Sequence, residues 1–152
     1  MVKVERRIVL PVGPQEAWTV LTDWERQADW MRDADRVEVL SAHREGPGVL
    51  IAVRTRVFNI PAFTERLEVV AWEPPHRLRV AHRSAIRGTG DWILEPYVGG
   101  TRFTWIEDVG LPLGALGRLA LAVYRPFMRH LMRGTMQDLR RVLIAAGPGG
   151  RH

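Results

Sequence analysis

Two ionisable residues, His82 and Glu107, occupy positions where the alternation of the sequence predicts apolar neighbours. Val80 has the parity of His82 in the run RLRVAHR, and Trp105 has the parity of Glu107 in the run TRFTWIEDV. Because alternate residues of a strand lie on the same face of a sheet, we expect both groups on an apolar inner face. Desolvation there raises the pKa of a carboxyl group and lowers that of an imidazole. Such a pair could act as general acid and base, or hydrogen-bond to the polar end of a ligand.

Two glycines, Gly88 and Gly90, are predicted to lie between these groups. If YVGG closes a hairpin, Gly90 lies opposite Glu107, and the preceding turn brings Gly88 close to His82. Two strand spacings of about 4.8 Å and an offset of about two residues then separate His82 from Glu107 by about 12 Å. We therefore expect no direct contact between them, and we expect a ligand resting on the two glycines to reach both side chains.

Each of these residues also has a purely structural interpretation. His82 could be a core histidine with satisfied hydrogen bonds. Glu107 could pair with Arg6 or lie at the wet mouth of a cavity. Thr135, the single hydroxyl on the apolar face of the last predicted helix, could bond back to its own backbone. The two glycines could mark a strand bend.

Other catalytic and metal-binding patterns are absent from the sequence. Neither serine, Ser41 or Ser84, lies in a G-x-S-x-G turn, and no two histidines have H-x-H or H-E-x-x-H spacing. Because the chain has no cysteine, thiol nucleophiles, disulfides and cysteine-bound metals are excluded. We therefore predict neither a metal nor a cofactor.

The charge of the chain allows an anionic partner. The 152 residues have a formal net charge of +5, and Lys3 is the single lysine among the basic residues. The arginines form either a solvated surface or a binding surface for an anionic membrane or RNA. Nucleic acid is the less favoured partner, because the chain lacks an RNP-type aromatic motif and has acidic residues among its outward arginines. No apolar run approaches the ~20 residues of a membrane span and the first residues are charged, so we expect a cytoplasmic protein; the sequence indicates no oligomeric state.

The periodicity predicts one strand, two short helices, six further strands and a long helix. The strands are expected at residues 3–10, 36–44, 49–58, 62–72, 77–83, 87–95 and 101–109. Short turns between them are typical of an antiparallel meander. Trp18, Trp24 and Trp30 are six residues apart, which turns a helix through about 600°, so they cannot share one helix face. Residues 14–30 are therefore predicted to form two helices, the second capped by Asp23; Trp18 and Trp30 belong to the core, and Trp24 to the core or an entrance.

The last helix is predicted to have one apolar face and one arginine-rich face. Its apolar positions, three or four residues apart, are Met128, Leu131, Thr135, Leu139, Val142 and Ala146. Its opposite face carries Arg129, Arg133, Gln137 and Arg140. An earlier apolar stripe consists of Leu116, Ala120, Val123 and Phe127. Pro126 predicts a kink between the two stripes.

This order of elements, with the segments PQEAW, VVAWEPPHRL and GTGDWILEPYVGGTRFTW and the closing arginine-rich helix, resembles the START-like (SRPBCC) superfamily, in its polyketide cyclase/dehydrase and lipid-transport branch. The terminal residues GPGGRH predict a disordered tail over residues 147–152. The resemblance implies an α+β helix-grip domain over residues 1–146. In that fold a curved seven-stranded antiparallel sheet wraps around the long C-terminal helix, and two short helices follow the first strand. It also implies a cavity for a hydrophobic or amphipathic small molecule, but no particular reaction, because the superfamily mixes carriers, sensors, cyclases and hydratases.

The favoured function is intracellular binding or carriage of a hydrophobic or amphipathic small molecule, such as a lipid, an isoprenoid quinone or a polyketide. One alternative is a cofactor-free cyclase, dehydratase or hydratase that uses His82 or Glu107 as acid or base. Another is a surface binder of RNA or anionic membrane. The residues expected to contact a ligand share inward parity or lie on the apolar face of the helix: Val53, Leu67, Val69, Val80, His82, Gly88, Gly90, Trp92, Phe103, Trp105, Glu107, Leu131 and Thr135.

Overall fold

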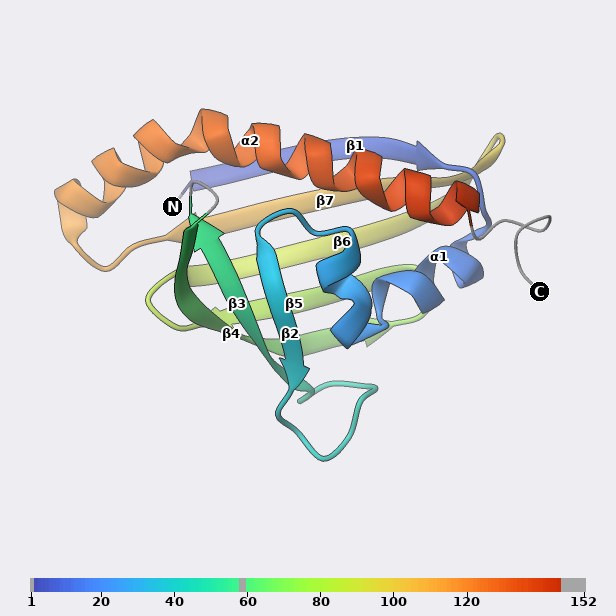
Figure 1. Ribbon diagram of the computed structural model, residues 1–152, viewed down its shortest axis with the longest axis horizontal. Helices are drawn as coiled ribbons and strands as arrows, with labels where there is room; N and C mark the ends of the chain where they lie inside the picture. Colours follow the sequence, from blue (N-terminus) through green and yellow to red (C-terminus); the bar gives the residue numbers. More distant parts are fainter. Residues whose placement is uncertain (1, 58–59, 146–152) are drawn as a thin grey trace.

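A curved sheet of seven antiparallel strands and one long helix form the body of the protein (Figure 1). The computed structural model describes residues 2–57 and 60–145. The elements are β1 (Val2–Leu10), α1 (Pro14–Leu21), the 3-10 helix η1 (Trp24–Asp29), β2 (Ala34–Val39), β3 (Leu50–Val57), β4 (Ile60–Glu73), β5 (Arg77–Arg83), β6 (Arg87–Tyr97), β7 (Gly100–Gly110) and α2 (Gly114–Ala145). The strand order β1-β7-β6-β5-β4-β3-β2 and the long C-terminal helix confirm the predicted α+β helix-grip fold.

The strands pair in the register that the alternation predicted. Gly90 of β6 lies opposite Glu107 of β7, and His82 of β5 lies opposite Gly88 of β6. Only the second strand differs noticeably from its prediction, since β2 is shorter and ends at Val39. The central hairpins therefore place the candidate site residues on three adjacent strands.

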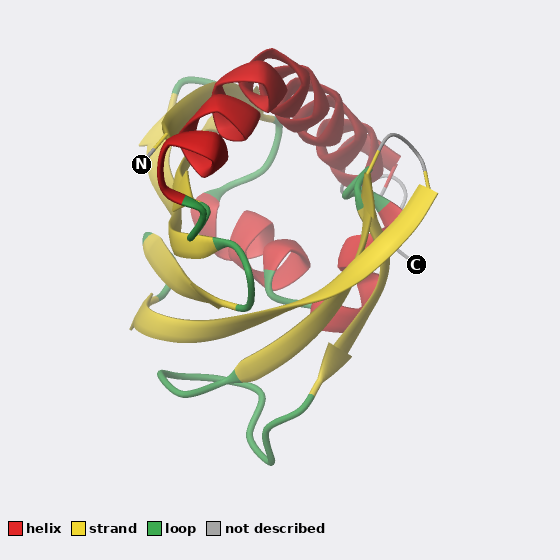
Figure 2. Ribbon diagram, turned by 90° about the vertical axis from the view of Figure 1, so that its left-hand side faces the viewer, coloured by secondary structure: helices red, strands yellow, loops and turns green. Residues whose placement is uncertain are grey.

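The sheet curls until α2 closes its open side (Figure 2). Register shifts interrupt the pairing of β3 with β4 at Thr55 and Arg56, and that of β4 with β5 between Val69 and Ala71. Bulges of this kind bend a strand and increase its twist. The sheet therefore bends within β4: its first part follows β2 and β3, which run at an angle to β5, β6 and β7, and its second part follows β5 (Figure 1). The curled sheet thus encloses an interior that α2 covers, as apolar sheet faces require.

The three tryptophans of α1, η1 and the residue after η1 all belong to the core. Trp18, Trp24 and Trp30 are 5%, 1% and 3% exposed. The Trp24 indole donates a hydrogen bond of 2.9 Å to the backbone carbonyl of Arg44, so this ring does not stand at an entrance. Asp23 precedes η1, but its side chain makes no capping hydrogen bond, and that prediction was wrong. The corner between the two short helices is therefore held mainly by buried indoles.

The second half of α2 packs with its predicted apolar face against the sheet. Thr135 and Leu139 are buried there, while Arg129, Arg133 and Arg140 are exposed. No helix in the described part of the chain is long and apolar enough to cross a membrane. Ala146 and the predicted tail, residues 147–152, lie outside the described residues.

The first half of α2 does not pack as the sequence pattern predicted. The helix runs continuously through Pro126 and is bowed along its length (Figure 1). Leu116 and Val123 of the predicted stripe are 66% and 73% exposed, whereas Gly117 and Leu121 are buried. Both sides of this segment are rich in apolar residues, so periodicity alone could not select the buried side.

Arginines on the outer face of the sheet are paired with acidic side chains, as their outward parity predicted. The pairs are Arg77 with Glu73, Arg79 with Asp91, Arg83 with Glu68, and Arg102 with Glu95, at 2.9–3.2 Å. Asp91 is buried, but the other three pairs are exposed or half-buried, and such pairs contribute little to the free energy of unfolding. Their main effect is to neutralise most of the positive charge on this face.

Candidate functional site

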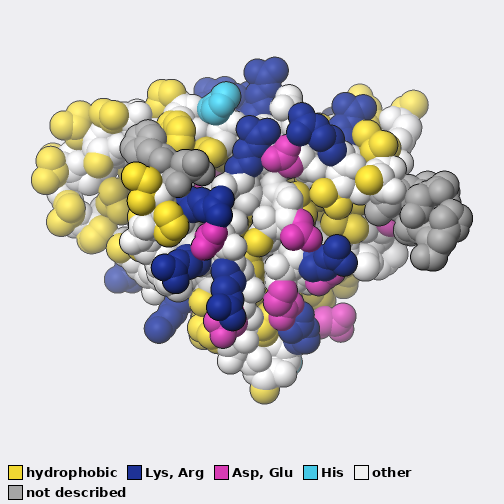
Figure 3. All heavy atoms as spheres, in the orientation of Figure 1, with side chains coloured by type: hydrophobic (Ala, Val, Ile, Leu, Met, Phe, Trp, Pro, Cys, Tyr) yellow, Lys and Arg dark blue, Asp and Glu magenta, His cyan; other side chains and the backbone are white. Residues whose placement is uncertain are grey.

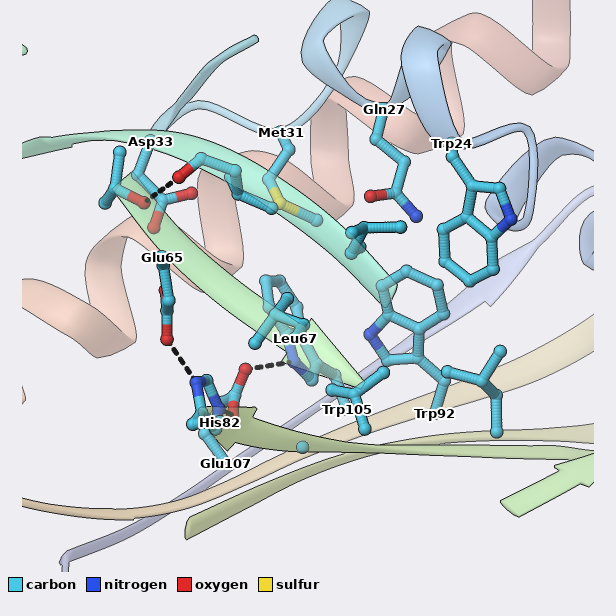
Figure 4. A pocket seen from close by; sticks show the side chains of 16 residues that line it. Trp24, Gln27, Met31, Asp33, Glu65, Leu67, His82, Trp92, Trp105 and Glu107 are labelled. Carbon is cyan, nitrogen blue, oxygen red and sulfur yellow. Dashed lines mark hydrogen bonds and ion pairs between the residues drawn. The ribbon is translucent and has the colours of Figure 1, made fainter. Parts of the chain in front are cut away.

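Four ionisable side chains gather between the sheet and α2 (Figure 4). We call Asp33, Glu65, His82 and Glu107 the acidic cluster. The His82 ring lies between two carboxylates: Nδ1 contacts Glu65 Oε1, and Nε2 contacts Glu107 Oε2 at 3.0 Å. Trp105 Nε1 donates a hydrogen bond of 3.1 Å to the other oxygen of Glu107. This geometry suits an imidazolium that donates one hydrogen bond to each carboxylate.

The direct contact between His82 and Glu107 overturns the expected separation of about 12 Å. The two residues stand on β5 and β7, but the β6 residue opposite Glu107 is Gly90. A Cβ at Gly90 would lie 2.8 Å from Glu107 Oε2, so the carboxylate occupies the space that a side chain would fill. Gly88 has a different role: its φ is +122°, and a Cβ there would lie 2.0 Å from the Asp108 carbonyl oxygen. The backbone therefore requires glycine at position 88, in agreement with the strand-bend interpretation.

The carboxylates raise the pKa of His82 to about 10. Burial alone lowers the pKa of an imidazole, but the hydrogen bonds and the negative charges of Glu107 and Glu65 outweigh this effect. The expected lowering was therefore wrong, because two acceptors contact the ring. At neutral pH His82 is a cation with both nitrogens protonated, so it can donate hydrogen bonds but cannot accept a proton.

Asp33 supplies a carboxyl group with a pKa raised to about 6. Burial is the largest cause, and the negative charges of Glu65 and Glu107 add to it, while a backbone hydrogen bond opposes it. A carboxyl group that titrates close to neutral pH can exchange a proton with a bound molecule. Asp33 is therefore the member of the cluster best suited to proton transfer.

The segment that carries Asp33 is fastened to α2. The backbone N–H of Arg32 donates a hydrogen bond of 3.1 Å to Thr135 Oγ1, and its guanidinium binds Asp138 with an Nε–Oδ2 distance of 2.7 Å. Thr135 therefore has a hydrogen-bond partner outside its own helix. Gly134 makes room for this contact, since a Cβ there would lie 2.4 Å from the Arg32 guanidinium.

The acidic cluster borders two cavities, of about 370 and about 80 Å³. The residues that line both are Asp33, Thr55, Glu65, His82, Trp105 and Glu107. The larger cavity extends along the first half of α2, where Leu121, Met128 and Met132 contribute apolar walls. Its volume lies in the range of about 300–1,000 Å³ that is typical of small-molecule sites.

Most of the residues expected to contact a ligand border one of these cavities. Those at the smaller cavity alone are Val53, Leu67, Val80, Gly90 and Trp92. Leu131 and Thr135 border the larger one alone, and His82, Trp105 and Glu107 border both. Val69, Phe103 and Gly88 border neither. The centroid of the Trp92 ring lies 6.1 Å from that of Phe103 and 6.5 Å from that of Trp105. These three packed rings fill the space at the centre of the sheet.

Two members of the cluster were not singled out from the sequence. Glu65 shares the parity of Leu67 on β4, so the alternation that placed Leu67 inward also indicated Glu65. Asp33 lies in the turn before β2, where no periodicity applies, and its position depends on the contact between Arg32 and α2. The sequence therefore offered a signal for Glu65, its inward parity, but none for Asp33.

A comparison with protein families identifies the group to which this fold belongs. The family model for polyketide cyclase / dehydrase and lipid transport matches residues 1–143. The chain belongs to this family. The resemblance to the START-like (SRPBCC) superfamily is thereby confirmed. No curated protein matches the sequence.

Several solved structures share the fold of this family member at low sequence identity. A protein from Thermus thermophilus superposes with a TM-score of 0.79 at 19% identity, over 96% of this chain and 99% of the other. The di-domain ARO/CYC StfQ from the steffimycin biosynthetic pathway gives 0.73 at 16% identity, over 92% of this chain and 49% of StfQ. A START superfamily protein from Mycobacterium smegmatis gives 0.68 at 12% identity, over 93% of both chains. These likenesses establish the fold and leave the ligand open.

Proposed function

We propose that the protein binds a hydrophobic or amphipathic small molecule between the sheet and α2, as a cytoplasmic carrier or sensor. The observation that carries this proposal is a mostly apolar cavity of about 370 Å³ with charged side chains along part of its wall. An apolar body placed there leaves water, at a gain of about 25 cal/mol per Å² of buried surface. The polar end of the same molecule would meet hydrogen-bond partners in place of hydrocarbon. The family description, which names polyketides and lipids, supports this class of ligand.

Native mass spectrometry of the protein purified from cells tests the proposal. We expect a co-purifying apolar compound with the wild-type protein. Leu131→Trp, at a half-buried position that borders the large cavity, should exclude the compound. Leu119→Trp, on an exposed position of the same helix, is the matched control and should retain it. Binding that survives Leu131→Trp, or is absent from the wild type, would contradict the proposal.

We further propose that the first half of α2 contacts an anionic lipid surface. Hydrophobic side chains gather at this end of the molecule (Figure 3). The exposed ones, 61–73% accessible, are Leu113, Leu116, Leu119 and Val123. Four exposed arginines of the same helix have no ion pair within the described residues: Arg118, Arg125, Arg129 and Arg133. Apolar side chains beside cations suit a bilayer interface with anionic lipids. We propose no nucleic acid partner, because the outer arginines of the sheet are paired with acids.

Co-sedimentation with vesicles of phosphatidylcholine and phosphatidylserine at low salt tests this contact. The wild type should bind these vesicles, and Leu116→Ser with Leu119→Ser should abolish binding. Replacing Arg129, Arg133 and Arg140 by glutamine should weaken binding strongly and leave the melting temperature almost unchanged. Ile144→Ser, at an exposed apolar position near the other end of α2, is the control that should bind normally. Absence of wild-type binding, or equal binding by the leucine variant, would rule out a membrane role.

A cofactor-free cyclase or dehydratase remains the second candidate function, and Asp33 is the observation that favours it. Its pKa of about 6 and the pKa of about 10 of His82 place a proton acceptor and a cationic donor in one site. The compound found by mass spectrometry should then be converted by the wild type. Asp33→Asn and His82→Gln should still bind it but lose turnover by about 10²-fold or more. The control Asp35→Asn, in the exposed ion pair with Arg56, should keep full turnover. A carrier would show no turnover, and His82→Gln or Glu107→Gln would weaken binding by about 0.5–1.5 kcal/mol.

A further inference from the structure

The acidic cluster contains more hydrogen-bond acceptors than donors. Its three carboxyl groups offer six oxygens, whereas the side-chain donors that reach them are the two ring nitrogens of His82 and the Trp105 indole. These donors serve Glu65 Oε1 and both oxygens of Glu107. Within the described residues, no side chain donates to Glu65 Oε2 or to the carboxyl group of Asp33, whose one donor is a backbone N–H. A carboxylate oxygen that has no side-chain donor and borders a cavity keeps lone pairs with which it can accept a hydrogen bond from a ligand.

The charge of the cluster leads to the same requirement. Glu65 and Glu107 carry two negative charges against the single positive charge of His82, and Asp33 adds a third negative charge above its pKa of about 6. Among the described residues that line either cavity there is no lysine or arginine. The arginines lie on the outer face of the sheet and on the exposed face of α2. The one cation that borders the cavities, His82, already uses both ring N–H groups on Glu65 and Glu107, so a ligand anion would lose its hydration without gaining a cationic hydrogen-bond donor.

We infer that the ligand of this cavity carries a hydrogen-bond donor without negative charge, such as a hydroxyl, a phenol or an ammonium group, and that carboxylate and phosphate ends are rejected. The apolar body lies in the larger cavity, and the donor binds Glu65 Oε2 and the carboxyl group of Asp33. Both residues border both cavities, and the charge of Glu65 acts on Asp33, so one polar end can reach the two of them. This assignment rests on the proposed binding of an amphipathic molecule and narrows its class. Rejection of anions is a form of specificity built from unpaired like charges.

Three probes that share one dodecyl chain test the inference. The equilibrium dissociation constants of dodecylamine, dodecan-1-ol and dodecanoate are measured at pH 7.5, below their micellar concentrations, by quenching of tryptophan fluorescence. The amine and the alcohol should bind, and dodecanoate should bind at least about tenfold more weakly than the alcohol, which corresponds to one missing hydrogen bond and an unfavourable charge. Because the chain is the same in all three, the difference reports the polar end alone.

Substitutions in the cluster show whether its charge sets the ranking. Glu65→Gln and Asp33→Asn each remove one carboxylate and should bring the dissociation constants of dodecanoate and dodecan-1-ol closer together. Glu68→Gln, on the outward side of β4 and paired with Arg83, is the matched control and should preserve the wild-type ranking. Two separate cluster variants are used, so that the second remains informative if the first folds poorly. The ranking of the three probes by the wild-type protein tests the inference without either variant.

The outcomes separate this inference from the proposed function. If dodecanoate binds as tightly as dodecan-1-ol, the head-group assignment is wrong while the apolar cavity keeps its role. The assignment is equally wrong if the ranking in both cluster variants equals that of the wild type. If none of the three probes binds, the proposed function and the assignment fall together.

Discussion

Gly90→Ala provides a selective way to disturb the acidic cluster. A Cβ at this position would lie 2.8 and 3.1 Å from the two carboxylate oxygens of Glu107, closer than such atoms normally approach. The backbone of Gly90 is not in the left-handed region, so alanine causes no strain of its own there. The clash involves the end of a flexible side chain, and Glu107 must therefore move away from His82.

The size of the effect follows from the contact that is lost. A hydrogen bond to a charged group contributes about 1.5–3 kcal/mol, and about 1.4 kcal/mol corresponds to one pH unit in a pKa. The pKa of His82, about 10 in the wild type, should therefore fall by about one to two units in Gly90→Ala. The fall should stop well above the value of an isolated imidazole, because Glu65 still contacts Nδ1.

The measurement is an NMR titration of the imidazole nitrogens between pH 6 and 11. Gly13→Ala serves as the matched control, since a Cβ there would meet nothing within 4 Å. Gly88→Ala is unsuitable, because its Cβ would strike the Asp108 carbonyl and destabilise the fold. The reasoning is refuted if His82 titrates at the same pH in Gly90→Ala and in the wild type, or if it titrates near 6.5 in the wild type.

Three further predictions concern stability and its pH dependence. The folded state favours protonated His82, so its contribution to the free energy of unfolding is complete below pH 6.5 and is lost as the pH rises towards about 10. The free energy of unfolding, measured by urea titration, should fall by up to about 5 kcal/mol over this pH range, and the fall should be much smaller in His82→Gln. Burial raises the pKa of Asp33 from its usual value of 3.8 to about 6 in the folded state, so ionisation of Asp33 destabilises the protein progressively as the pH rises from about 4 to about 6. Asp33→Asn should therefore raise the unfolding free energy at pH 8 by up to about 3 kcal/mol and leave it nearly unchanged at pH 3.5. Thr135→Val removes the acceptor of the Arg32 N–H and should cost about 1–3 kcal/mol, whereas Thr135→Ser keeps the acceptor; equal stability of the two variants would show that this hydrogen bond contributes nothing.

The sheet was predictable because its signals are local. Alternation with a period of two and short turns gave the strands, and matching apolar residues such as Trp92 and Trp105 gave the register of the last hairpin. Parity also placed His82 and Glu107 correctly on the inner side. Sequence patterns therefore sufficed wherever a residue's position depends only on its neighbours along the strand.

The contacts across the site depend on what lies between strands, and there the predictions failed. The separation predicted for His82 and Glu107 was calculated from the spacing of strands β5, β6 and β7. It neglected that Gly90 has no side chain, so the side chains of His82 and Glu107 meet above β6. The wrong direction predicted for the His82 pKa shift has the same cause. Burial without partners lowers the pKa of an imidazole, whereas burial between two carboxylates raises it. Asp33 depends on a tertiary contact about a hundred residues away in the chain, which no periodicity encodes.

The pairing of β1 with β7 has a consequence for the synthesis of this protein. Every other pair of neighbouring strands is consecutive in the chain, but roughly ninety residues separate the end of β1 from the start of β7. Closing so long a loop costs about 3 kcal/mol more chain entropy than closing a four-residue turn. At about 5–20 residues per second, β1 leaves the ribosome roughly 5 to 20 seconds before its partner strand exists. Its outward charges, Lys3, Glu5 and Arg7, would hinder pairing with other nascent chains during that interval.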